Sequence, residues 1–257
     1  MKQITLNAPF SVKGKGLHTG MVIEAEFLPA PDNHGYKFQR TDLEGEPVID
    51  ALAENVIHTE RGTVIARGEV SVSTIEHAMA ALYAAGIDNV LIRINGAEMP
   101  ILDGSAREIS EKIQSVGVVS QNENKDYYIV KQKLEVRDDA TGALILVLPD
   151  DDFSIDVKIQ FDSPVIPNQF ASLDVIDNFD KDIASSRTFV FVREIEPLVK
   201  ANLIKGGDLE NAVVIYDQTM EQSQLDKLAD MMNVPHKEVD EFGYIQATPL
   251  RWANEPA

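Results

Sequence analysis

Glu76 and His77 are adjacent residues whose types suit metal-assisted hydrolysis. They follow Ser73 and Thr74 in a pattern typical of a helix N-terminus, with Glu76 in the place of a capping acid. Neighbouring helical positions point about 100° apart, so a general base and a metal ligand there could approach one bound water from different directions. The two residues also fit an ordinary capped helix with a partly buried histidine, so the pair alone does not predict a metal site.

His236 and Asp240 form a second constellation with metal-ligand spacing. Residues at i and i+4 share a helix face, which suits two of the three ligands in a zinc site built from two histidines and a carboxylate. A short polar run of this kind is also typical of a solvated helix end. Because the chain contains no cysteine, any metal in it must be held by histidine, aspartate or glutamate.

Three further segments could serve a reaction centre, and each also has a plain structural interpretation. The glycines of segment 14–20 would let the backbone approach a ligand closely, or would form a tight hairpin turn. Segment 98–106 could orient a neighbouring site, or form a turn and a helix cap. Thr188 beside Phe189 would place a hydroxyl next to an apolar passage, or mark a strand with alternating faces. Taken singly, these residues indicate a soluble α+β protein and leave hydrolysis as one open function.

Hydrophobic periodicity predicts the elements that carry these residues. In the first half it predicts strands at 21–28, 63–66 and 90–94, and helices at 73–86 and 105–117 that each open with a capping box. In the second half it predicts strands at 127–136, 143–148, 153–161 and 212–216, a hairpin turn at 139–142, and helices at 193–203 and 222–232.

The polar stretch 120–126 is interpreted as a linker between two domains. It divides the chain into an N-terminal α+β domain at 1–122 and a C-terminal α+β domain at 127–257. The last residues contain two prolines and close no element, so the C-terminal domain is expected to be incomplete and to lack its last elements.

Composition narrows the class of partner. The chain has 42 acidic and 23 basic residues and a net charge of -19, which repels nucleic acid and anionic membranes, so no nucleic acid partner is expected. No apolar run approaches the roughly 18 residues that span a bilayer, and the first residues lack a signal-peptide core. We therefore expect no transmembrane segment and a cytoplasmic location.

Eight segments, taken together and in order, resemble one family. They are Gly14 to Gly20, Leu28-Pro29-Ala30-Pro31, Arg40-Thr41-Asp42-Leu43, Ser73-Thr74-Ile75-Glu76-His77, Gly86-Ile87-Asp88-Asn89, Glu98 to Ala106, Ser186-Arg187-Thr188-Phe189 and Gly206-Gly207. The family is that of the UDP-3-O-acyl-N-acetylglucosamine deacetylases (LpxC), which catalyse the committed step of lipid A synthesis, and so of lipopolysaccharide assembly, in Gram-negative bacteria.

The resemblance implies a fold and a set of roles. The fold is two α+β domains, each a β-sheet layer packed on a helical layer, with the active site between the two helical layers. Among catalytic groups, His77 matches a zinc ligand, Glu76 the general base and Thr188 the hydroxyl that helps to stabilise the oxyanion. Among substrate-binding residues, Leu17, His18, Thr19 and Phe189 match positions that border the site. The implied cofactor is Zn²⁺, and the implied substrate is a lipid-bearing UDP-sugar.

The sequence departs from the family at the remaining metal ligands. The family takes them from a His-Lys-x-x-Asp motif that follows a Leu-Arg-aromatic-x-x-Glu segment, and here that segment lies at 250–255, after His236. On motif order we expect His236 and Asp240 not to be ligands, although the opposite assignment stays open. No histidine matches the family's downstream catalytic histidine.

These departures carry expectations for the chain itself. With one matched ligand, it is expected to bind zinc weakly or not at all and to be inactive, as a C-terminally truncated piece of a longer enzyme. Exposed apolar surface on the second domain would then favour self-association. The other expected partner is a fused C-terminal domain in the longer protein. The alternatives are a non-catalytic UDP-sugar binding module and an unrelated two-domain scaffold.

Overall fold

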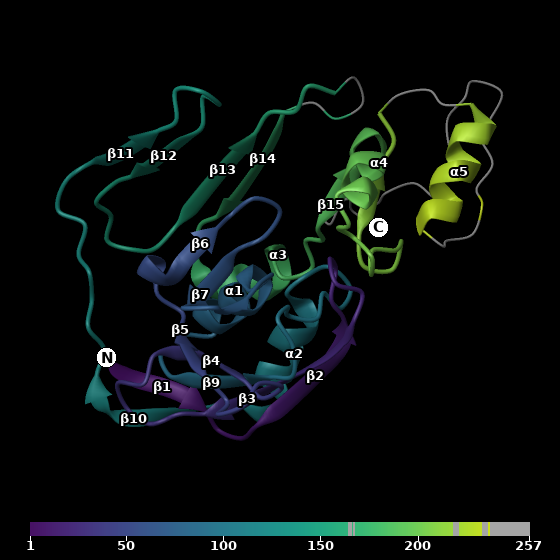
Figure 1. The fold of residues 1–257 in the computed structure, drawn as a ribbon. Coiled ribbons are helices and arrows are strands. Elements are labelled where there is room, and N and C mark those ends of the chain that lie inside the picture. Colours follow the sequence, from purple (N-terminus) through teal and green to yellow (C-terminus); the bar gives the residue numbers. More distant parts are fainter. Residues whose placement is uncertain (164–165, 167, 218–220, 233–235, 237–257) are drawn as a thin grey trace.

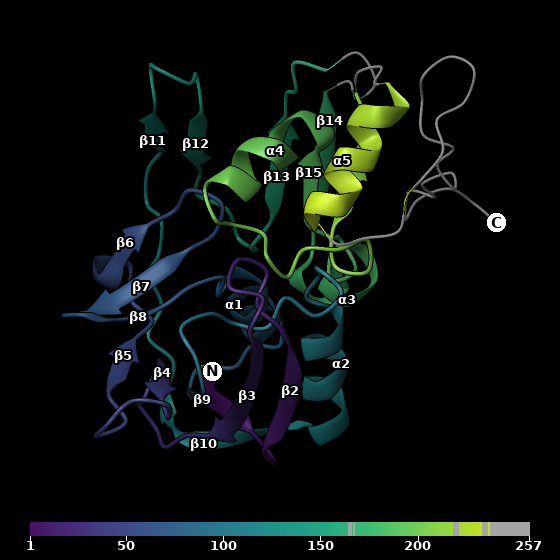
Figure 2. The same ribbon diagram turned by 45° about the vertical axis from the view of Figure 1, so that its right-hand side comes forward.

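A five-stranded mixed sheet forms the centre of residues 1–124 in the computed structural model, which describes residues 1–163, 166, 168–217, 221–232 and 236 (Figures 1 and 2). Its strand order is β2 (Phe10–Lys15), β3 (Val22–Pro29), β9 (Val90–Ile94), β4 (Tyr36–Arg40) and β5 (Val48–Asp50). The strands pair antiparallel except β4 and β9, which run parallel. The predicted strand at 90–94 is confirmed residue for residue, and that at 21–28 is shifted by one.

Two helices, α1 (Glu76–Ala84) and α2 (Arg107–Val116), contact each other and contribute to the same core as the sheet. Ala81 and Leu82 of α1 and Ile113 of α2 are buried with the inward side chains of the strands, among them Phe27 and Ile92. The apolar faces that result from the alternation in the strands and from the helical repeat in α2 therefore pack into one apolar core. The confirmed fold class is mixed α+β.

The predicted capping boxes do not form. The N-cap residues are Ile75 and Ala106, and neither makes a side-chain cap hydrogen bond. Thr74 has a positive φ of 58° and donates its hydroxyl to Glu98, while the Ser105 hydroxyl donates to Asp103. The short polar side chains before both helices are thus engaged with segment 98–106, and both helices start later than predicted.

Smaller sheets flank the central one. A three-stranded sheet comprises β6 (Val56–His58), β7 (Val64–Arg67) and β8 (Val70–Val72), and the short helix η1 (Ala53–Asn55) precedes it. β1 (Lys2–Leu6) pairs antiparallel with β10 (Val118–Asn124). The interpretation of residues 120–126 as a linker is therefore wrong for residues 120–124, because a polar strand still satisfies its backbone in a ladder. The division into two domains stays a prediction.

The second half is made of hairpins and helices. The strands are β11 (Leu134–Arg137), β12 (Leu144–Val147), β13 (Ile155–Ile159), β14 (Gln169–Leu173), β15 (Phe189–Phe191) and β16 (Val213–Ile215), and the helices are η2 (Ile176–Asn178), α3 (Phe179–Asp182), α4 (Val192–Lys200) and α5 (Gln222–Met232). β11–β12 and β13–β14 are antiparallel pairs, and β15–β16 is parallel. The predicted turn at 139–142 and the helix at 222–232 are confirmed, but the strand predicted at 127–136 begins only at Leu134.

Apolar side chains of these hairpins are exposed, as expected for the second half. They include Ile145, Leu146, Ile155, Val157 and Phe170. Whether they mediate self-association stays a prediction. Among the described residues, no helix has the length and apolar character needed to cross a membrane.

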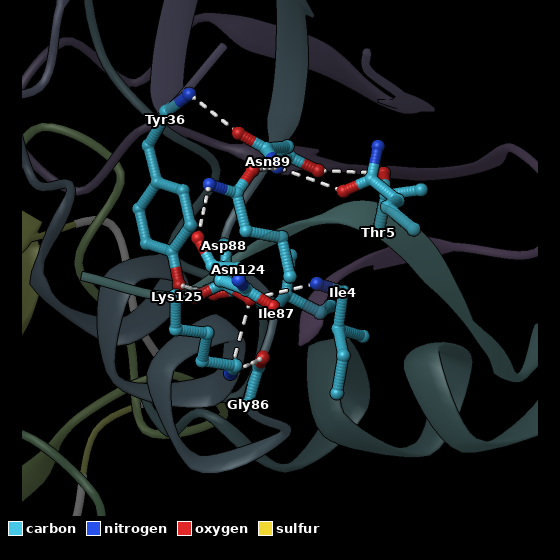
Figure 3. Close-up of polar contacts among 12 residues, drawn as sticks. Ile4, Thr5, Tyr36, Gly86, Ile87, Asp88, Asn89, Asn124 and Lys125 are labelled. Carbon is cyan, nitrogen blue, oxygen red and sulfur yellow. Dashed lines mark hydrogen bonds and ion pairs between the residues drawn. The ribbon is translucent and has the colours of Figure 1, made fainter. Parts of the chain in front are cut away.

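A buried polar cluster fastens β1 to the turn before β9 (Figure 3). Asn89 is 1% exposed; its Oδ1 accepts from the N–H of Gly35 at 2.8 Å, and its Nδ2 donates to Gln3 at 2.8 Å and to Gln121 at 2.7 Å. Beside it, the Asp88 carboxylate accepts from the N–H of Ile4 at 2.7 Å. Every polar atom of the Asn89 side chain is therefore used.

The same cluster holds Tyr36 and Lys125. Burial, with smaller contributions from Asp88 and Tyr83, raises the pKa of Tyr36 above its usual range, so its hydroxyl remains a donor to the carbonyl of Ile87. Lys125 donates to the carbonyl of Gly86 at 2.8 Å and pairs with Asp88 at 3.0 Å. Lys125, the residue directly after β10, is thus bonded to the turn after α1 (Figure 3).

Asn89→Ala should lower the free energy of unfolding by about 2–4 kcal/mol, because it leaves buried donors and acceptors without partners. Urea unfolding followed by circular dichroism measures this. The matched control is Asn95→Ala, since Asn95 is exposed and accepts one hydrogen bond, from Glu24. Equal losses in the two variants would contradict the role given to the buried cluster.

Candidate active site

Glu76 is the first residue of α1, and its carboxylate is oriented by a backbone donor. Oε2 accepts from the N–H of Thr63 at 2.9 Å, from the segment that enters β7. The side chain is half-buried. A carboxylate at a helix N-terminus with one oxygen held in place can present its other oxygen to a small molecule.

His77 follows Glu76 and is also half-buried. Burial lowers the pKa of His77 below its usual range, although the nearby carboxylates of Glu76 and Asp103 act in the opposite direction. The neutral imidazole is therefore favoured at neutral pH, and it is the form that binds a metal.

Leu17, His18 and Thr19 lie in the connection between β2 and β3, as the hairpin interpretation predicted. The N–H groups of His18 and Thr19 donate to the carboxylate of Glu98 at 2.8 and 2.9 Å. The carbonyl of Leu17 accepts from the N–H of Gly206 at 3.0 Å. This connection therefore joins the N-terminal half to the segment after α4.

The ring of His18 is directed by Arg61. Nε2 lies 3.2 Å from the carbonyl oxygen of Arg61, and since a carbonyl only accepts, Nε2 carries the proton. Nδ1 is buried and has no partner among the described residues. In the neutral ring this nitrogen is an acceptor, and a buried acceptor without a partner marks a place where a ligand or water group can bind.

Arg187 and Thr188 contact the backbone of Asp103 and Gly104. Nε of Arg187 donates to the carbonyl of Asp103 at 2.7 Å, and the N–H of Thr188 donates to the carbonyl of Gly104 at 2.7 Å. The carbonyl of Thr188 accepts from the N–H of Val213 at 2.9 Å. Both backbone groups of Thr188 are used, so the backbone at Thr188 is fixed next to segment 98–106.

Gly104 makes this contact sterically feasible. It has a φ of +85°, and a Cβ built on it would overlap the carbonyl oxygen of Asn211. Only glycine combines that backbone conformation with so close an approach of another backbone.

Phe189 begins β15 beside Thr188 and is 40% exposed. Its ring makes edge contacts with Phe161 and Phe191, at centroid distances of 5.4 and 5.9 Å. The guanidinium of Arg193 lies over the Phe191 ring, 4.3 Å from its centroid. Thr188 therefore precedes a strand whose first residue belongs to a partly exposed aromatic cluster, and the apolar passage beside its hydroxyl stays a prediction.

Segment 98–106 connects the predicted site residues. It bonds to the 17–19 connection and to Thr74 through Glu98, and to Arg187 and Thr188 through Asp103 and Gly104. His236 shares none of these contacts; its exposed ring pairs with Asp230 at 2.7 Å and Asp226 at 3.4 Å of α5. The hydrogen bond to Asp230 raises the pKa of His236. Asp240 lies outside the described residues.

The described residues offer one candidate metal ligand of the predicted kind, His77. In that part of the chain, no group of three or more His, Cys, Asp or Glu side chains could hold a metal ion. The donor set that is present therefore fits part of a zinc site and does not complete it.

Sequence reasoning missed the pair of Arg61 with Glu194, and it singled out segment 98–106 without giving Glu98 a role of its own. A lone acid in the apolar run around 99–101 was a usable signal for Glu98, which is fully buried. No sequence pattern predicts the 2.8 Å ion pair of Arg61 with Glu194, because the partners are 133 residues apart and both are partly exposed. This pair joins the segment before β7 to α4.

Gly104→Ala should destabilise the protein by about 3 kcal/mol or more, because backbone strain adds to a clash with fixed backbone. The matched control is Gly117→Ala at the end of α2, which has a φ of 75° and open space around a built Cβ. Gly117 has a ψ of 177°, in a backbone region that is essentially restricted to glycine, so the control should lose about 1–3 kcal/mol from strain alone. Thermal unfolding of both variants measures the difference, and equal losses would remove the steric argument.

Arg61→Gln should raise the pKa of Glu194, because the hydrogen bond from Arg61 is the largest cause that lowers it and the charge of Arg61 adds a smaller effect. Stability from a lowered carboxyl pKa is present above the unfolded pKa and is lost as pH falls through the folded pKa. The free energy of unfolding of the wild type should therefore exceed that of the variant by up to about 1 kcal/mol at pH 7, and this difference should vanish in acid.

Carboxyl carbon chemical shifts followed through a pH titration would measure the pKa of Glu194 directly. Glu196, which pairs with Lys200 on the same helix, serves as the internal reference and should titrate alike in both proteins. An unchanged pKa of Glu194 in the variant would show that Arg61 does not control it.

Comparison with known proteins identifies the family that the chain matches. Residues 3–251 match the family described as LpxC: UDP-3-O-acyl N-acetylglycosamine deacetylase. Over 100% of its length the chain is 59% identical to the bifunctional enzyme LpxC/FabZ of Bacteroides thetaiotaomicron, of which it spans 56%. It is 57% identical to the bifunctional enzyme LpxC/FabZ of Porphyromonas gingivalis, again over 100% of this chain, and spans 55% of that protein.

A third relative carries a single name. The UDP-3-O-acyl-N-acetylglucosamine deacetylase of Citrifermentans bemidjiense is 40% identical over 97% of this chain and 81% of its own length. The mixed α+β architecture agrees with the fold that the resemblance implied. The chain belongs to the UDP-3-O-acyl-N-acetylglucosamine deacetylase (LpxC) family.

Proposed function

We propose that the protein containing this chain is a zinc-dependent deacetylase that hydrolyses the acetamide of a UDP-3-O-acyl-N-acetylglucosamine for lipid A biosynthesis. The products are acetate and a free amine on the glucosamine. The observation that carries the proposal is the Glu76–His77 pair at the first turn of α1, in a chain of the deacetylase family. The relatives' printed names support the substrate class.

Zinc, when bound, lowers the pKa of its water and polarises the amide carbonyl. His77, half-buried and favoured as neutral imidazole, fits one ligand position. Catalytic zinc usually takes three protein ligands, so the others would come from outside the described residues. On the order of the family's motifs, the proposal includes that the 257-residue chain by itself binds zinc weakly and is inactive.

Glu76 is the residue that takes the proton of the attacking water. The N–H of Thr63 fixes one carboxylate oxygen, which leaves the carboxylate a defined orientation at the helix N-terminus. A general base must lie within hydrogen-bond reach of the proton that it removes, and such orientation favours that geometry.

Thr188 supplies a hydroxyl to the oxyanion that forms when the amide carbonyl is attacked. Such donors work best when their direction is fixed before the reaction, because no reorganisation is then needed in the transition state. The bonds of the Thr188 backbone to Gly104 and Val213 fix the point from which this hydroxyl extends.

Substrate contacts are assigned to the connection 17–19 and to Phe189. The buried acceptor Nδ1 of His18 suits a sugar hydroxyl, and the exposed edge of the Phe189 cluster suits the acyl chain. A cytoplasmic location and a fused C-terminal domain, as in relatives named bifunctional, belong to the same proposal.

Glu76→Gln in the whole protein should lower kcat about 10²–10⁴-fold while its zinc content is kept, because the amide cannot accept the proton. Thr188→Val should lower kcat about a hundredfold through loss of one oxyanion donor. Acetate release and metal analysis measure both effects, and Glu111→Gln on the exposed side of α2 is the control.

The isolated chain gives the second arm of this test. It should hold well under one zinc per chain and release no acetate. Stoichiometric zinc in the isolated chain that is lost in His236→Ala would place a ligand at His236, against our assignment. Binding of a UDP-sugar by the whole protein without zinc and without acetate release would favour the non-catalytic binding module instead.

A further inference from the structure

Glu98 is a fully buried carboxylate that the proposed reaction does not use. Its exposed fraction is 0%, and it accepts three hydrogen bonds: His18 N–H to Oε1 at 2.8 Å, Thr19 N–H to Oε2 at 2.9 Å, and the Thr74 hydroxyl to Oε1 at 3.3 Å. Within the described residues it forms no ion pair. The carboxylate is therefore held by hydrogen bonds alone.

A buried carboxylate is costly unless several donors surround it. Two successive backbone N–H groups directed at one anion form a concave binding site, and Glu98 fills such a site from inside the protein. An ionised carboxylate only accepts, so it matches all three donors at once. A side-chain amide of the same shape would turn a donor toward at least one of them.

Gly16 shows how close this approach is. A Cβ built on Gly16 would overlap Oε2 of Glu98 and the hydroxyl oxygen of Thr19. The absence of a side chain at this position lets the connection wrap the carboxylate. The close packing against Glu98 therefore explains why a glycine stands at position 16 of segment 14–20.

The backbone on both sides of Glu98 is bonded to the residues before α1. The N–H of Met99 donates to the carbonyl of Ser73 at 3.0 Å, and the N–H of Ser73 donates to the carbonyl of Ala97 at 2.9 Å. Thr74, which donates to Glu98, stands two residues before Glu76. One side chain thus links the 17–19 connection to the start of the helix that carries Glu76 and His77.

We propose that Glu98 is a positioning residue that holds the backbone of residues 17–19 in register with the start of α1, so that substrate binds in line with Glu76. This inference rests on the proposed function for its substrate. A core acid with a merely structural role would affect stability only. A positioning residue affects substrate binding in the protein that remains folded.

Glu98→Gln in the whole protein tests this, because size is kept and one acceptor becomes a donor. The KM for the UDP-sugar should rise about tenfold to a hundredfold with kcat nearly unchanged, since a misplaced loop weakens binding more than chemistry. Glu111→Gln should leave both constants unchanged. Activity that falls only in proportion to the folded fraction, with KM unchanged, would overturn the proposal.

Gly16→Ala is the second variant in case Glu98→Gln folds poorly. It keeps the carboxylate but displaces it from the connection, so the same rise in KM is expected. An unchanged KM in a folded Gly16→Ala protein would also count against the proposal.

Amide hydrogen exchange provides a readout that does not depend on the proposed function. In Glu98→Gln, the amides of His18 and Thr19 should exchange at least about tenfold faster, while those of Ala81 and Leu82 inside α1 keep their rates. Uniform acceleration, or none, would overturn the positioning role. Selective acceleration in Glu98→Gln would uphold the role of Glu98 even if the wild-type whole protein released no acetate. That second result would refute the deacetylase proposal alone.

Discussion

The backbone of segment 98–106 is the constraint on which the rest of the candidate site depends. Its first residue binds the 17–19 connection and Thr74, and its middle accepts hydrogen bonds from Arg187 and Thr188. α2 starts directly after it, at Arg107, and buries Ile109 and Ile113 in the core. Because one end of the segment is anchored in the core, groups more than 80 residues apart in sequence take their positions from one rigid support.

These contacts are asymmetric in free energy. A satisfied buried hydrogen bond contributes about 1 kcal/mol net, whereas a buried donor left without an acceptor costs about 1–3 kcal/mol. The architecture at Gly104 and Glu98 consists of such bonds, so it tolerates little change in shape or in hydrogen-bonding sense. By contrast, the exposed pair of Arg61 and Glu194 is screened by water and contributes less, although it spans the same two halves.

The sequence predicted those parts of the fold whose signal is local. The strand Val90–Ile94 and the helix Gln222–Met232 follow from periodicity and were predicted with their observed bounds. The capping boxes failed because Thr74 bonds to the distant Glu98 and Ser105 bonds to the nearby Asp103. The first partner leaves no trace in a local pattern, whereas an Asp two residues before Ser105 is a local competitor. The linker failed because polarity alone does not distinguish a free segment from a strand such as Val118–Asn124.

The assignment of residues to the candidate site stays a prediction, and their hydrogen-bond partners could not be predicted from the sequence. Resemblance supplied Glu76, His77 and Thr188, while the residue types alone left each with an ordinary structural interpretation. What the residues could not supply was the partner of each backbone group, such as Thr63 for Glu76 or Gly104 for Thr188. Those partners come from tertiary packing of loops, for which residue identity carries little information.

The way the site is held has a consequence for metal loading. The bonds that orient the Glu76 carboxylate and hold the Thr188 backbone come from the backbones of Thr63, Gly104 and Val213, all within the protein. Their order therefore does not require a bound cation. Under the proposed function, zinc binding then need not also orient the base or fix the backbone that carries the oxyanion donor, so both are in place before the metal and substrate arrive. Metal affinity and alignment of the reacting groups are in that case separable properties, set by different residues.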